Sequence, residues 1–104
     1  MELFKNKFEQ PSVDEGVFIE RAENEVDILA EDLKNRNWTE VWSNLCHTEL
    51  NSPSITAKMS PEAQEKFKSL IIETKEIFTA EKENVDKDLV DSIQGALDKI
   101  SENL

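Results

Sequence analysis

The sequence predicts an all-α protein: a compact bundle of three or four amphipathic helices preceded by a short N-terminal arm. Apolar residues recur along most of the chain at intervals of three and four, which is the period of a helix with one buried face. The 104 residues include only 2 glycines, 3 prolines and no tyrosine, a composition that favours long helices over turn-rich sheets. A chain of this length suits one hydrophobic core. We therefore expect a single helical domain over residues 1–104.

The N-terminal arm is expected over residues 1–11, before a bundle that occupies residues 12–104. Leu3, Phe4 and Phe8 have near-helical spacing, and Pro11 favours a break after Gln10 because the residue before a proline avoids helical geometry. This segment is therefore interpreted as an arm or a short docking helix.

The first long helix is predicted to start at Ser12, because Ser12 and Glu15 have the spacing of a capping box. Its buried stripe recurs at helical intervals and consists of Ile19, Ala22, Val26, Leu29 and Leu33. On the neighbouring arc, four carboxylates spaced by three, four and four residues form what we call the acidic ridge: Glu20, Glu23, Asp27 and Glu31. We expect the whole ridge to face water.

A shorter second helix is predicted to follow Asn37, which repeats the capping spacing with Glu40, and to end near Thr48. Its inner face is aromatic and comprises Trp38, Val41, Trp42 and Leu45. Two indoles one turn apart would supply much of a small core, so we expect both tryptophans to be buried. Their exposure as binding anchors is the alternative.

The C-terminal half is predicted to hold two further helices after a connector that ends near Met59. Ser60 and Pro61 are a strong helix start, since a proline at the first helical position gives up an N–H that has no partner there. The inner face of this third helix comprises Ala63, Phe67, Leu70, Ile71, Thr74, Ile77 and Phe78. A separate stripe comprises Leu89, Ile93, Leu97, Ile100 and Leu104. One continuous helix is the alternative, but the two stripes drift out of phase, and we expect a break between Glu83 and Asp86.

Catalytic and metal chemistry have little support in the sequence. The chain has one cysteine, Cys46, and one histidine, His47; as helix neighbours they would point about 100° apart and could not readily bind one ion together. A single cysteine cannot form an internal disulfide. We expect Cys46 to pack as a small apolar group and His47 to lie at the surface. The sequence therefore predicts a non-enzymatic protein without a metal site or cofactor.

The charge of the chain excludes several classes of partner. With 12 basic and 23 acidic residues the net charge is −11, which disfavours direct binding to nucleic acid or to an anionic membrane. No apolar run has the length of a membrane span or a signal-peptide core, so the cytoplasm is the expected location. The acid lies in residues 1–35 (4 basic, 10 acidic) and 61–104 (6 basic, 11 acidic), whereas residues 36–60 are neutral (2 basic, 2 acidic).

These observations predict a small acidic protein that binds another protein through a basic surface of that partner. It would act as an inhibitor, an immunity-type protein or an adaptor, with the acidic ridge imitating nucleic-acid charge. The expected partner-binding residues are Glu20, Glu23, Asp27, Glu31, Trp38 and Trp42. A solvated surface is the simpler interpretation of the acid. The alternative function is a structural helical protein that self-associates through the tryptophan helix or the last apolar stripe.

Overall fold

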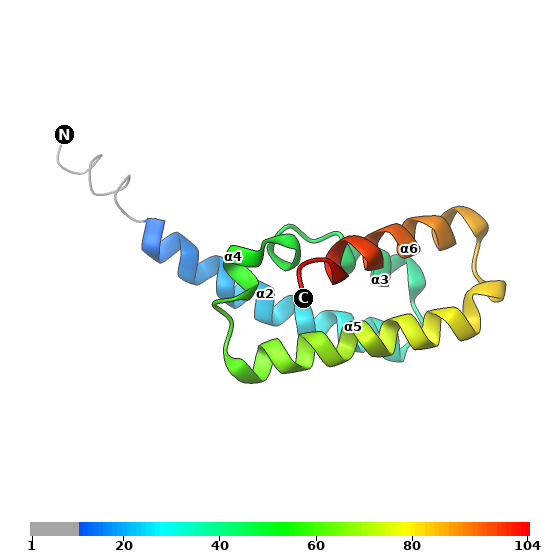
Figure 1. Ribbon diagram of the computed structural model, residues 1–104, viewed down its shortest axis with the longest axis horizontal. Coiled ribbons are helices and arrows are strands. Elements are labelled where there is room, and N and C mark those ends of the chain that lie inside the picture. The colour runs from blue at the N-terminus through cyan, green and yellow to red at the C-terminus, as the bar shows by residue number, and fades with distance from the viewer. Residues whose placement is uncertain (1–10) are drawn as a thin grey trace.

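The all-α prediction is confirmed by the computed structural model, which describes residues 11–104, with side chains from Gly16 onward. The described residues contain no strand. They form five α-helices and two 3-10 turns (Figure 1): α2 (Pro11–Lys34), α3 (Trp38–Leu45), η1 (Glu49–Asn51), α4 (Pro53–Thr56), α5 (Pro61–Glu81), η2 (Lys82–Asn84) and α6 (Lys87–Ser101). None of these helices is both long and apolar enough to cross a membrane. The expected arm, with Leu3, Phe4 and Phe8, lies outside the described residues, as do the side chains of Ser12 and Glu15.

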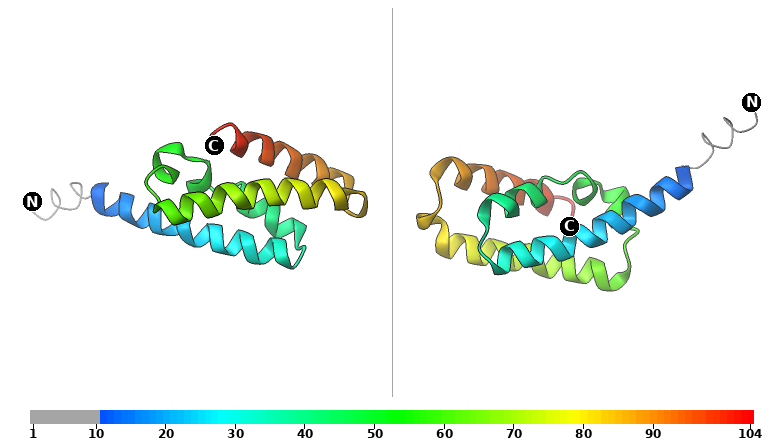
Figure 2. Two further views of the ribbon diagram at one scale, coloured as in Figure 1. Left: turned by 60° about the horizontal axis from the view of Figure 1, so that its bottom comes forward. Right: turned by 180° about the vertical axis from the view of Figure 1, so that it is seen from behind.

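The long helix α2 is the element against which most of the others pack. It contacts α3, α4, α5 and η1, and α3 packs in turn against α6. The views in Figures 1 and 2 show α2 and α5 side by side and running in the same direction, with the N-terminal end of α2 extending past the other helices.

The predicted stripe of α2 is buried, which confirms the helical period. Ala22, Val26, Leu29 and Leu33 are each at most 2% exposed, and Ile19 packs against the edge of the core. The rest of the core comes from every other helix except α4, and from the turns between them: Val41, Leu45, Leu50, Met59, Phe67, Leu70, Ile71, Phe78, Ile93, Leu97 and Ile100. The inner faces predicted for the helices after residue 60 are therefore largely correct, although Leu104 is 44% exposed.

Helix α2 ends in a Schellman motif. The N–H of Arg36 donates to the carbonyl of Leu33 (3.0 Å) and that of Asn37 to the carbonyl of Asp32 (2.9 Å). Arg36 adopts φ 55°, a left-handed conformation that glycine would enter without the roughly 1–2 kcal/mol cost of a side chain. Its guanidinium makes two contacts from this position, because Nε donates to Glu81 Oε2 at 3.0 Å and Nη1 donates to the Leu33 carbonyl at 2.8 Å. The residue thereby joins the end of α2 to the end of α5.

The number of helices exceeds the prediction of three or four because the expected connector contains α4. Pro53 is in the first turn of this helix, and Thr56 is buried with its hydroxyl donating to the Ser52 carbonyl at 3.3 Å. Ile55 packs against the core and Met59 is only 3% exposed. The expected connector is thus anchored to the core through Ile55 and Met59.

The break in the C-terminal half is confirmed. Ser60 caps α5 as predicted, since its hydroxyl accepts from the N–H of Ala63 at 3.1 Å. The helix ends at Glu81, η2 follows, and α6 begins after Asp86, whose side chain makes no capping hydrogen bond. Separate helices allow the stripes of α5 and α6 to face one core despite their different phase.

The two tryptophans have different environments, so the expectation that both are buried is wrong for Trp42. Trp38 is half-buried, and its ring meets that of Phe78 edge-on, with centroids 5.4 Å apart and an interplanar angle of 63°. Trp42 is 38% exposed. Val41 and Leu45 already occupy the inward side of α3, which places Trp42 at its rim.

We predict that Trp38→Ala lowers the free energy of unfolding by about 2–4 kcal/mol, somewhat less than for a fully buried tryptophan, because it removes the contact between α3 and α5. Trp42→Ala is the matched control and should cost less than about 1 kcal/mol. Urea denaturation followed by circular dichroism measures both. Equal losses would contradict the placement of the two rings.

Candidate functional site

The acidic ridge is only partly free in the structure. Glu20 and Glu31 are exposed, as expected. Glu23 instead accepts a hydrogen bond from the backbone N–H of Ser60 at 2.8 Å, and Asp27 forms an ion pair with Lys66. The prediction that the whole ridge faces water is therefore wrong for Glu23, which is half-buried, whereas Asp27 is exposed but paired. These two carboxylates hold α2 beside the start of α5.

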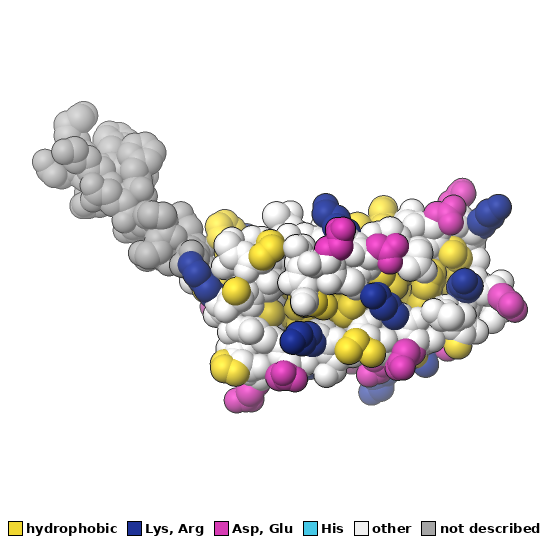
Figure 3. Space-filling model, in the orientation of Figure 1, with side chains coloured by type: hydrophobic (Ala, Val, Ile, Leu, Met, Phe, Trp, Pro, Cys, Tyr) yellow, Lys and Arg dark blue, Asp and Glu magenta, His cyan; other side chains and the backbone are white. Residues whose placement is uncertain are grey.

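A wider acidic surface lies across α2 and α5. On α5, Glu62, Glu65, Glu73 and Glu76 follow one another at intervals of three, eight and three residues, which places them on one outward arc at 100° per residue. The contacts of Glu23 and Asp27 with the start of α5 place this arc next to the ridge. Figure 3 shows acidic side chains along the lower edge, over α5. We define the acidic face by its exposed carboxylates: Glu20, Asp27, Glu31, Glu62, Glu65, Glu73 and Glu76. The exposed bases Lys34, Lys66 and Lys68 lie among or beside them.

The aromatic candidates lie on a different side of the molecule from the ridge. Asn44 of α3 donates to Asp32 of α2 at 2.7 Å, and Asp32 is roughly 140° around the α2 axis from Asp27. The structure thus does not bring Trp38 and Trp42 together with the acidic ridge. If both sets of residues bind a partner, they do so as two separate surfaces.

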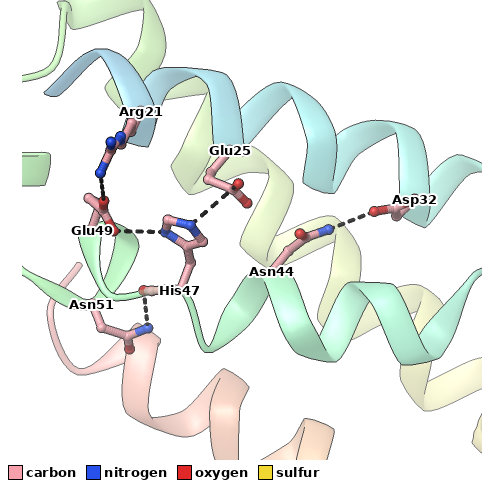
Figure 4. Close-up of polar contacts among 7 residues, drawn as sticks. All are labelled: Arg21, Glu25, Asp32, Asn44, His47, Glu49 and Asn51. Carbon is pink, nitrogen blue, oxygen red and sulfur yellow. Dashed lines mark hydrogen bonds and ion pairs between the residues drawn. The ribbon is translucent and has the colours of Figure 1, made fainter. Parts of the chain in front are cut away.

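A polar cluster that the sequence did not indicate joins α2 to the segment after α3 (Figure 4). His47 lies between two carboxylates: its Nε2 is 3.5 Å from Glu25 Oε1 and its Nδ1 is 2.9 Å from Glu49 Oε2. Glu49 is only 8% exposed, and its other oxygen lies 3.9 Å from Arg21 Nη1. Asn51 stabilises the same turn by donating to the backbone carbonyls of Leu45 and His47 at 2.8 and 2.9 Å.

The geometry of this cluster favours a structural role. The two carboxylates lie at opposite ring nitrogens of His47, so they cannot both bind one ion together with the same nitrogen. Among residues 16–104 no group of three His, Cys, Asp or Glu side chains is arranged to hold a metal. Glu49 is two residues after His47, so their proximity can be read from the sequence. The proximity of Arg21 and Glu25 cannot, because only the fold brings α2 beside η1.

Cys46 is exposed, which contradicts its expected packing as a small apolar group. It follows the last residue of α3 and lies one turn after Trp42, on the same outward side of the helix. His47 is 34% exposed at its side chain, so its expected surface position is confirmed only in part.

Comparison with known proteins found no matching family model, curated protein or solved structure. The functional argument therefore depends on the surfaces described above.

We predict that His47→Ala lowers the free energy of unfolding by about 1–3 kcal/mol, because it leaves the buried Glu49 carboxylate without its nearest partner. A double-mutant cycle with Glu49→Gln isolates this interaction. The cost of His47→Ala should be clearly smaller in the Glu49→Gln background, as measured by urea denaturation. An equal cost in both backgrounds would show that the two side chains do not interact.

Proposed function

We propose that this chain is a small, non-enzymatic cytoplasmic protein that binds a second protein through that partner's basic surface, as an inhibitor, an immunity-type protein or an adaptor. The observation that supports this most is the exposure of its acid. Of the 19 carboxylate side chains in residues 16–104, 14 are exposed. A surface of this kind attracts cationic proteins and accelerates their association.

The acidic face of α2 and α5 is the proposed contact surface. Its seven carboxylates outnumber the three lysines among or beside them, and Ile72, which is 60% exposed, lies at its border on α5. An exposed apolar side chain beside like charges provides a short-range contact after long-range electrostatic attraction has oriented the partner.

Imitation of nucleic-acid charge is the mechanism proposed for this face. Carboxylates one helical turn apart lie about 6 Å from each other, so a row of them presents regularly spaced negative charge. The intramolecular contacts of Glu23 and Asp27 interrupt the row on α2. On α5, Glu62 and Glu65 form one such pair and Glu73 and Glu76 form another, so these two pairs become the more important part of the imitation.

The test compares two variants that change the net charge equally. The first replaces four exposed carboxylates that form no hydrogen bond or ion pair within residues 16–104: Glu20→Gln, Glu31→Gln, Glu62→Gln and Glu73→Gln. The second neutralises the outer side of α6: Asp88→Asn, Asp91→Asn, Asp98→Asn and Glu102→Gln, all at exposed positions. Each protein is immobilised and used to capture partners from native lysate, and the association kinetics of the captured protein are then measured.

We expect the first variant to bind a captured basic protein at least tenfold more weakly, mainly through slower association, and with a reduced dependence on salt between about 0.05 M and 0.3 M. The α6 variant should bind nearly as the wild type does. Thermal melts confirm that both variants fold. Equal weakening by both variants would show that only the net charge matters and not the position of the carboxylates. Unchanged binding by the first variant would contradict the proposed face.

A further inference from the structure

We propose that the exposed side of α3 around Trp42 is a contact between two copies of this chain. This surface is separate from the acidic face. It combines a partly exposed indole and a hollow next to it, a pairing that suits a two-fold symmetric dimer. In such a dimer each copy offers the same patch, and the side chain of one fills the hollow of the other.

The exposed group is the indole of Trp42, 38% of whose surface is accessible to water. The residues one turn before and after it are Trp38, which is half-buried, and Cys46, which is exposed. Tryptophan is the side chain most enriched among residues that dominate binding energy, since it buries a large rigid surface. The half-buried Trp38 fixes the backbone from which Trp42 extends, so the indole is presented on a rigid helix.

The hollow begins at Cys46 and has a volume of about 440 Å³. It lies between the end of α3 and α6, and its lining includes Leu45, Cys46, Thr48, Ala96 and Lys99. Cys46 is four residues after Trp42, so the Cβ atoms of these two residues lie about 6 Å apart. The hollow and the indole are therefore neighbours. A two-fold axis passing close to Cys46 would exchange them.

Charge favours a second copy at this surface. Two chains of net charge −11 repel one another, so they can approach most closely where acid is sparse. Glu40 is the one exposed carboxylate on α3, and Lys99 is the one charged side chain that lines the hollow. A basic partner gains little attraction from a surface with so few carboxylates.

The contact is small, so the dimer should be weak. One indole, one hollow and their surroundings fall short of the roughly 800 Å² per partner found in stable complexes. We therefore expect a monomer–dimer equilibrium that depends on protein concentration. Salt should strengthen the dimer, because it screens the repulsion between the two acidic chains. The basic partner of the proposed function responds to salt in the opposite direction, so the two proposals can fail separately.

Sedimentation equilibrium over a wide range of concentration and salt tests the proposal. Wild type should dimerise, and more tightly at high salt. Trp42→Ala should weaken the dimer about 30-fold or more, the loss typical of a dominant interface residue. Thr48→Glu, which places a carboxylate in the hollow, should weaken it similarly. Ile72→Ala removes an exposed apolar side chain from α5 and is the matched control, which should leave the dimer unchanged.

Cross-linking gives an independent measurement of the geometry. Cys46 is the single cysteine of the chain, so a short bismaleimide can join two copies only at this position. We expect efficient cross-linking of the wild type and little of Trp42→Ala. A strict monomer at all concentrations, a dimer that Trp42→Ala leaves intact, or a dimer that salt dissociates would overturn the proposal. Capture of a basic partner at Trp42 without dimerisation would do so too.

Discussion

Burial of the apolar stripe of α2 is the constraint on which the rest of the structure depends. Ala22, Val26, Leu29 and Leu33 are almost fully removed from water, and α3, α4, α5 and η1 all pack against this helix. Apolar burial is worth roughly 25 cal/mol per Å², but it has no direction. Polar contacts on either side of the stripe supply the direction. Asp32 accepts a hydrogen bond from α3 on one side, and Glu23 accepts one from the N-cap of α5 on the other.

This arrangement divides the acid of the chain into two groups with different consequences. Carboxylates beside the stripe, such as Glu23 and Glu25, contact other elements and position them. Carboxylates farther around the helices remain in water, where they repel one another slightly and give the protein its surface potential. An acidic composition therefore overstates the number of carboxylates that a partner can reach. The uneven distribution also leaves the side of α3 that carries Trp42 nearly uncharged.

The sequence predicted most of the fold because periodicity and capping are local properties. The stripe of α2, the Ser60 start of α5 and the break before α6 each followed from residues within a few positions of one another. The misses required tertiary information. Trp42 and Cys46 have apolar side chains on a short helix whose inward side was already filled, which spacing alone does not reveal. The pairing of Asp27 with Lys66 joins residues 39 positions apart, and no local pattern marks it.

Amide hydrogen exchange of the native protein, resolved by residue, tests the central role of α2 most directly. If its stripe supports every other element, the amides of residues 22–33 can exchange only when the whole protein unfolds. We therefore predict that they are among the slowest to exchange, with an opening free energy equal to that of global unfolding from denaturant titration. The amides of α4 should exchange faster through local opening. Rapid exchange along residues 22–33 while α5 and α6 stay protected would contradict this account.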